Sequence, residues 1–89
     1  MKKTIITVVG KDSIGIIAKI CTYLSEKSVI VLNISQTIVD GFFNMIMIVD
    51  MPETVDFTLV NEELNNLGEN LGVSIKIQRE EIFNKMHRI

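Results

Sequence analysis

The chain has 89 residues, which is enough for one domain with one hydrophobic core but not for a second lobe. Its formal net charge of −2 and scattered charges argue against a nucleic-acid-binding protein, because that role requires a basic face. No apolar run approaches the roughly 20 residues of a membrane span, and the single cysteine, Cys21, cannot form an intrachain disulfide. These features indicate a soluble, cytoplasmic domain that contacts neither nucleic acid nor a membrane.

The apolar content is high for so small a chain. Apolar residues make up 47% of the sequence, and the mean hydropathy is +0.34. A domain of this size hides only about 60–65% of the surface that its unfolded chain exposes. We therefore expect part of the apolar surface to be buried against another subunit, most simply in a homodimer.

The first expected elements are a strand and a helix. Residues 4–9 are all β-branched or aliphatic, which is typical of a central strand covered on both faces. A helix is predicted from about Ser13 to Lys27, since Ile17, Ile20, Cys21 and Leu24 recur at helical spacing.

The turn between them reads Gly10-Lys11-Asp12-Ser13-Ile14-Gly15. We expect Gly10 to adopt backbone angles closed to other residues, and Gly15 to let a ligand or another backbone approach closely. Asp12 or Ser13 is expected to cap the helix, whose remaining free N–H groups favour a carboxylate or phosphate. A turn that binds nothing is the simpler interpretation of these residues alone.

The next two runs predict a hairpin. Residues 31–39 and 42–49 read as strands joined by Asp40-Gly41, a strong two-residue turn signal that pairs Val39 with Phe42. The side chains expected on the face that meets the helices are Leu32, Ile34, Ile38, Phe43, Met45, Met47 and Val49. The opposite face has no helix to cover it, and it is expected to carry Val31, Phe42, Ile46 and Ile48.

The second half predicts a helix, a strand and a tail. Apolar residues from Phe57 to Leu71 recur at helical spacing, with Thr54 or Asp56 as N-cap and Gly72 just past the end. Gly68, inside this helix, suggests a close approach to a neighbouring element. An alternating strand follows from Val73, and residues 81–89 are expected to form a short amphipathic helix or arm. This tail is assigned to the same domain as residues 1–80.

This order of elements predicts an α+β fold of the ferredoxin-like type, βαββαβ. Right-handed crossovers and one hairpin give a four-stranded antiparallel sheet of order 4-1-3-2, with two helices on one face and the short C-terminal helix in addition. The strand formed by residues 31–39 then lies at an edge of the sheet.

The sequence contains no set of residues with the types and spacing of a catalytic site. The only histidine, His87, lies near the chain end, and Cys21 falls on the apolar face of the first helix. There is no Cys-x-x-Cys pair, no cluster of histidine and cysteine with metal-ligand spacing, and no phosphate-binding glycine motif. We therefore expect no enzyme activity, no catalytic residue, no metal site and no cofactor.

Asn33 is the polar residue that requires an explanation, because asparagine is disfavoured in strands. Its amide offers two donors and one acceptor, which suit both ends of a zwitterion. A solvated edge residue is the alternative interpretation.

With these residues in view, the chain resembles the ACT domain family over about residues 3–80. The resemblance rests on Gly10-Lys11-Asp12-x-x-Gly15-Ile16 after the first strand and on Val31-Leu32-Asn33-Ile34 at the start of the second. It is closest to the stand-alone proteins of the UPF0237 group, which end in a short Ile-Phe-containing helix, here within residues 81–86.

The resemblance implies an amino-acid-sensing regulatory module whose ligand lies between two ACT units. Carried over by position, the ligand-binding residues are Gly10, Lys11, Asp12, Ser13, Ile14, Gly15, Asn33 and Ile34. Family members often have asparagine or histidine in the loop and proline before the glycine, whereas this chain has Asp12 and Ile14. Asp12 would attract an ammonium and repel a carboxylate, so the usual ligand orientation is in question.

Two functions follow. The first is a regulatory module that binds an amino acid or similar metabolite at a homodimer interface, as a dimer or as a tetramer of two dimers, and signals to a separate partner protein. The second is an interaction subunit without a small ligand, whose apolar sheet face and C-terminal arm dock a partner enzyme or regulator.

Overall fold

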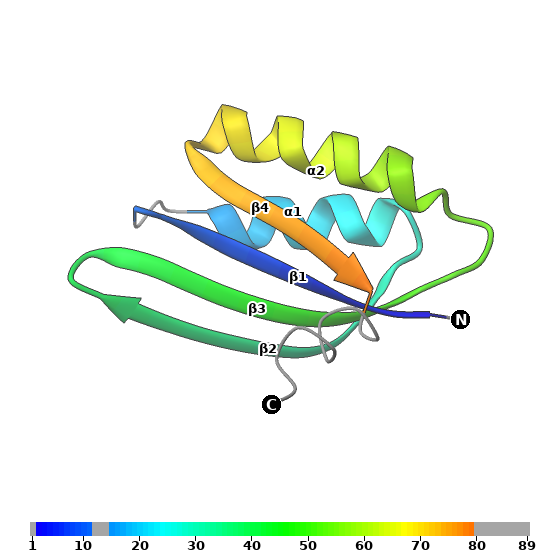
Figure 1. The fold of residues 1–89 in the computed structure, drawn as a ribbon, viewed down its shortest axis with the longest axis horizontal. Helices are drawn as coiled ribbons and strands as arrows, with labels where there is room; N and C mark the ends of the chain where they lie inside the picture. Colours follow the sequence, from blue (N-terminus) through cyan, green and yellow to red (C-terminus); the bar gives the residue numbers. More distant parts are fainter. Residues whose placement is uncertain (1, 12–14, 80–89) are drawn as a thin grey trace.

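The computed structural model describes residues 2–11 and 15–79. Along the chain it contains β1 (Lys2–Lys11), α1 (Ile16–Glu26), β2 (Ile30–Val39), β3 (Phe42–Met51), α2 (Phe57–Leu71) and β4 (Val73–Arg79). The strands form one four-stranded antiparallel sheet of order β2-β3-β1-β4, which is the expected order 4-1-3-2 counted from the opposite edge (Figure 1). The C-terminal helix expected over residues 81–89 lies outside the described residues.

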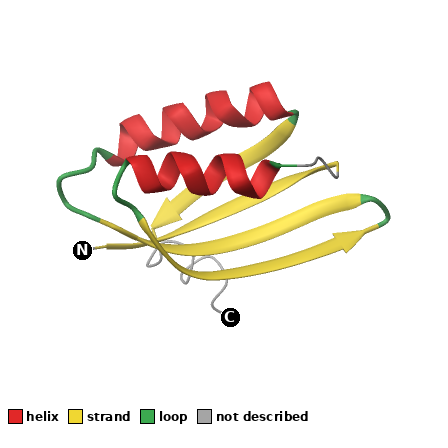
Figure 2. Ribbon diagram, turned by 180° about the vertical axis from the view of Figure 1, so that it is seen from behind, coloured by secondary structure: helices red, strands yellow, loops and turns green. Residues whose placement is uncertain are grey.

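Both helices pack on the same face of the sheet, and the core lies between them and the strands (Figure 2). Each helix presents an apolar stripe at helical spacing to this core. Alternate residues of β1, β3 and β4 complete it, because side chains alternate between the two faces of a strand. The fully buried core side chains are Ile6, Val8, Ile16, Ile20, Leu24, Met45, Met47, Val49, Val60 and Leu64.

The β2–β3 hairpin has the expected turn but not the expected alternation throughout. Val39 pairs with Phe42, as the Asp40-Gly41 turn predicts. A bulge between Val31 and Asn33 then shifts the register, so Val31 lies opposite Val49 and packs against the core, while Leu32 is 50% exposed. The expectation of an inward Leu32 and an outward Val31 was wrong, because one extra residue in a strand reverses the alternation beyond it.

The helices also leave β2 uncovered. Ile34 and Ile38 lie on the helix side of the sheet, where they pair with Met47 and Phe43, yet they are 41% and 55% exposed. Apart from Val31, every residue of β2 is exposed. The prediction that the helix-facing side chains of this hairpin are buried is therefore confirmed for β3 and wrong for β2, which is an edge strand (Figure 1).

Gly10 and Gly15 exchange the roles that the sequence suggests for them. A Cβ atom added to Gly10 would lie 2.5 Å from Cγ1 of Val73, its partner across the β1–β4 pair, so Gly10 allows a close approach of two strands. Gly15 instead has a φ of 87°, in the left-handed region that favours glycine.

The start of α1 differs from the prediction. The helix begins at Ile16, Gly15 occupies the N-cap position, and no side chain caps it. The N–H of Lys19 donates to the Gly15 carbonyl at 3.0 Å, which makes Gly15 the first acceptor of the helix. The expectation that Asp12 or Ser13 occupies the N-cap position is wrong, because Gly15 occupies it, and the side chains of Asp12 and Ser13 lie outside the described residues.

Both ends of α2 follow the prediction. The carboxylate of Asp56 accepts a hydrogen bond from the N–H of Thr58 at 2.9 Å, so Asp56 rather than Thr54 is the N-cap. Gly72 ends the helix with a φ of 75°.

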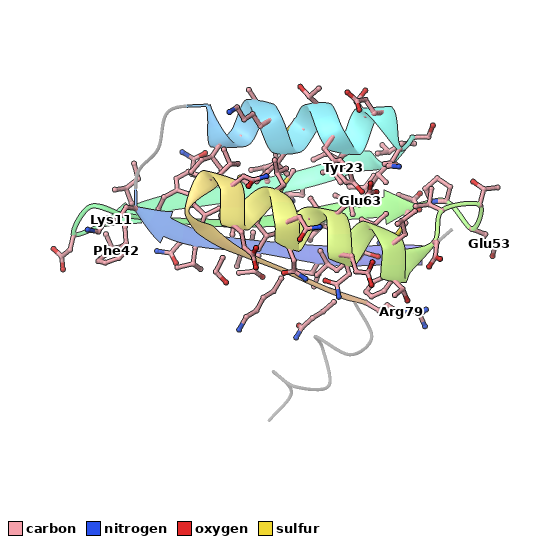
Figure 3. The ribbon with its side chains drawn as sticks, turned by 90° about the horizontal axis from the view of Figure 1, so that it is seen from above. Lys11, Tyr23, Phe42, Glu53, Glu63 and Arg79 are labelled. Carbon is pink, nitrogen blue, oxygen red and sulfur yellow. The ribbon has the colours of Figure 1, made fainter. Side chains whose placement is uncertain are left out.

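A polar contact joins the two helices on their outer side (Figure 3). The hydroxyl of Tyr23 donates to Oε1 of Glu63 at 2.6 Å, and Nζ of Lys27 lies 3.3 Å from the same oxygen. The hydrogen bond from Tyr23, together with the charge of Lys27, holds the pKa of Glu63 below its ordinary value. Burial and the Glu63 carboxylate raise the pKa of Tyr23.

This contact predicts a pH-dependent contribution to stability. Because the pKa of Glu63 is depressed in the fold, its contribution is complete above its ordinary pKa of 4.5 and is lost as pH falls through the depressed value. Glu63→Gln should therefore lower the urea midpoint at pH 7 and have a smaller effect at pH 3. Glu62→Gln, at the exposed position next to it, is the control. Equal pH profiles for the two variants would contradict the prediction.

Candidate ligand site at the sheet edge

The loop part of the expected site lies where β1 ends and α1 begins. Gly10 and Lys11 are the last two residues of β1, and Gly15 precedes α1. Lys11 is exposed and pairs with Phe42, which is 49% exposed, at one end of the sheet (Figure 3). Asp12, Ser13 and Ile14 lie outside the described residues. The start of α1 and the Lys11 ammonium thus flank this end of the sheet.

The strand part of the expected site lies on β2. Asn33 is exposed and pairs with Ile48, so its side chain projects from the face that has no helices. It makes no hydrogen bond to any other side chain among the described residues. Ile34 projects from the opposite, helix-bearing face. The two residues can therefore contact a common ligand only around the open edge of the strand.

Within one chain the loop part and the strand part are far apart. Lys11 shares a rung of the sheet with Phe42 and Val39, whereas Asn33 shares a rung with Ile48 and Ile5. The two rungs are separated by the six positions between Ile5 and Lys11 of β1, or about 20 Å of strand. One small ligand cannot bridge the two parts in a single copy of the chain. Sequence spacing alone could not show this, because it depends on the register of two strand pairs.

Apolar side chains accompany the polar ones along this edge. Ile30, Leu32, Ile38 and Val39 of β2 are all about half exposed, at 50–57%. A long, apolar edge strand presents unpaired N–H and C=O groups, and proteins usually cover such an edge. The edge is therefore a surface on which another strand could pair.

Other chemistry is sparse in the described part of the chain. No group of three or more histidine, cysteine, aspartate or glutamate side chains gathers there as a metal site. Cys21 is half-buried and packs against the core. None of the helices described is both long and apolar enough to cross a membrane.

The chain thus forms a ferredoxin-like βαββαβ domain with a glycine-flanked loop before α1 and an exposed edge strand. The sequence profile of the ACT domain matches residues 2–78. The chain belongs to the ACT domain family.

Full-length relatives support this assignment. The chain is 60% identical to the UPF0237 protein of Bifidobacterium longum (strain NCC 2705) over 100% of both chains. It is 46% identical to a UPF0237 protein of the archaeon Methanocaldococcus jannaschii, again over 100% of both chains.

Solved structures share the fold. An ACT domain protein from Streptococcus pneumoniae superposes with a TM-score of 0.83 at 41% identity, over 92% of this chain and 93% of the other. A putative glycine cleavage system transcriptional repressor superposes with a TM-score of 0.78 at 19% identity, over 88% of this chain and 45% of the other. The second likeness shows the fold alone.

Proposed function

We propose that this protein is a cytoplasmic, non-catalytic regulatory module that binds an amino acid or similar small metabolite between two copies of the chain and signals to a separate partner protein. The observation that carries the proposal is the separation of the two parts of the site, about 20 Å in one chain, together with the open apolar edge of β2. Two copies that join through this edge can bring the parts together.

An antiparallel pairing of two β2 strands about a two-fold axis has the required geometry. With the axis at Gln36, Ile34 of each copy lies opposite Ile38 of the other, which forms two apolar cross-strand pairs. The same axis places Asn33 opposite Val39 of the second copy, on the rung that Val39 shares with Phe42 and Lys11. Asn33 of one copy is then about three strand spacings, or 14 Å, from Lys11 of the other.

The ligand class follows from the chemistry of the residues proposed for the site. The N-terminal end of α1 and Lys11 favour a carboxylate, whereas the Asn33 amide and the carboxylate of Asp12 suit an ammonium. A ligand that touches both copies stabilises the assembly that forms its site. The change in assembly is then the signal that a partner protein reads.

A thermal-shift screen of the purified chain against the twenty amino acids, each at millimolar concentration, tests this function. A ligand present at about 100 times its Kd adds roughly 2.7 kcal/mol of stability, and such a gain raises the Tm of a small domain by several degrees. Asn33→Ala should abolish the shift. Thr37→Ala, at an exposed position on the same face of the same strand, should keep it. An amino acid is excluded as the ligand if none shifts the Tm, and the site at Asn33 is wrong if the two variants respond alike.

A second candidate function is an interaction subunit without a small ligand. It is favoured by the apolar side chains on the sheet face that has no helices, where Val9, Phe42 and Ile46 are 40–49% exposed. Deletion of residues 81–89 discriminates between the two. Loss of oligomerisation with no ligand response in the full chain supports docking, whereas a ligand response that survives the deletion supports the regulatory module.

A further inference from the structure

A second concave site lies at the end of the sheet opposite to Lys11. It is a cavity of about 470 Å³ between the start of α2, the β3–α2 connection and the ends of β1 and β4. Figure 3 shows Arg79 and Glu53 at this end of the molecule, with Lys11 and Phe42 at the other. The candidate site at the β2 edge shares no residue with it.

A positioned arginine lies at the cavity. Arg79 is the last residue of β4, and its guanidinium carbon lies 5.3 Å from the ring centre of Phe57, the first residue of α2. This cation–π contact orients the guanidinium plane while leaving its N–H groups available. They form no ion pair with any carboxylate of the described residues. A planar, pre-oriented guanidinium matches a carboxylate, because it can donate two parallel hydrogen bonds.

A buried hydroxyl lies beside the arginine. Thr4 pairs directly with Arg79 across the β1–β4 ladder, so both side chains project from the same face of the sheet. Thr4 is 1% exposed, is the single buried polar residue among the described ones, and lines the cavity. Its hydroxyl can donate a hydrogen bond to an oxygen of a ligand bound in the cavity.

The rest of the lining is partly apolar and partly polar. Met51, Val55 and Phe57 supply apolar walls, while Asp56 and Thr58 stand at the helix start. The Asp56 carboxylate already caps α2, so the positive end of this helix is offset by the protein's own charge. That leaves Arg79 as the group that selects for one negative charge, and a second negative charge on a ligand would face Asp56.

We propose that this cavity binds a small organic monocarboxylate with a compact apolar body. The carboxylate lies on Arg79 and accepts a hydrogen bond from the Thr4 hydroxyl, and the apolar body lies against Met51, Val55 and Phe57. A volume of about 470 Å³, lined by both apolar and polar side chains, is large enough for a small molecule. The inference does not depend on the ligand proposed for the β2 edge.

The test is a titration of the ¹⁵N-labelled full chain with 3-methylbutanoate, followed by ¹H–¹⁵N NMR. Saturable shifts are expected at the amides of Thr4, Phe57 and Arg79, and none at Lys11 or Gly15. Arg79→Gln should raise the Kd at least tenfold. Thr4→Val, which keeps the shape and removes the hydroxyl, should raise it severalfold.

Two controls make the result specific. Lys76→Gln removes a charge from β4 on the opposite face of the sheet, where Lys76 pairs with Thr7, and should leave the Kd unchanged. The alcohol 3-methylbutan-1-ol has the same carbon skeleton without the carboxylate and should not saturate. The proposal is overturned if the acid fails to saturate, if Arg79→Gln and Lys76→Gln behave alike, or if the shifts centre on Lys11 and Gly15.

Discussion

Gly68→Ala is expected to destabilise the fold, although alanine is the better helix former. Alanine in place of an interior helix glycine contributes about 1 kcal/mol of favourable propensity. In this fold the added Cβ would lie 2.8 Å from the backbone oxygen of Val73 and 3.1 Å from Cγ1 of Ile75. Overpacking of this kind costs about 1–3 kcal/mol, and a backbone oxygen cannot move aside as a flexible side chain can. Packing should therefore outweigh propensity.

The expected net loss is up to about 2 kcal/mol, which lowers the Tm of a domain of this size by up to roughly 16 °C. Thermal and urea unfolding of Gly68→Ala measure it. Asn66→Ala, at an exposed position two residues earlier on α2, should change the Tm little. A Gly68→Ala variant that is more stable than the parent would mean that α2 and β4 are less closely packed than their contact at Val73 indicates.

Gly68 also illustrates which features of the fold can be predicted from the sequence alone. A glycine inside a helical pattern, a glycine after it and an Asp-Gly pair between two strands are local signals. Gly68, Gly72 and the pairing of Val39 with Phe42 were all predicted from them and are confirmed. Local backbone chemistry decides these features, so a single sequence contains the information.

The features that were missed depend on contacts between distant segments. The sequence pattern assigns Gly10 a turn conformation, but its role comes from Val73, which lies far along the chain. The bulge at Leu32 follows from the fit of β2 against β3, and regular alternation cannot predict it. The start of α1 also differs from the prediction, because Gly15, in a left-handed conformation, occupies the N-cap position that a polar side chain was expected to fill.

The same distinction applies to the candidate sites. The loop and Asn33 could be selected from residue type and position, but their separation required the observed register. The cavity beside Arg79 had no sequence signal at all. Thr4 and Arg79 come from opposite ends of the chain, and only the β1–β4 pairing brings them onto one face of the sheet.

The largest expected effect concerns the β2 edge, where Ile38→Lys should convert the proposed dimer into monomers. With the two-fold axis at Gln36, the substitution places a lysine opposite Ile34 twice in each dimer. Each site loses part of the 1.5–3 kcal/mol that burial of an aliphatic side chain supplies, so the dimer loses about 3 kcal/mol in all. The dissociation constant should rise about a hundredfold, which sedimentation equilibrium can measure.

Two further variants test the register rather than the edge alone. Leu59→Lys changes a side chain of α2 that is 46% exposed, outside the β2 edge, and should leave the dimer intact. Combining Ile38→Lys with Ile34→Glu sets opposite charges across both pairs, so the double variant should recover dimerisation that the single variant loses. Recovery would fix the axis at Gln36 and with it the placement of Asn33 beside the second copy's loop. If Ile38→Lys stays dimeric while Ile46→Lys dissociates, the copies instead join through the sheet face that has no helices, and the ligand proposed between β2 edges has no site.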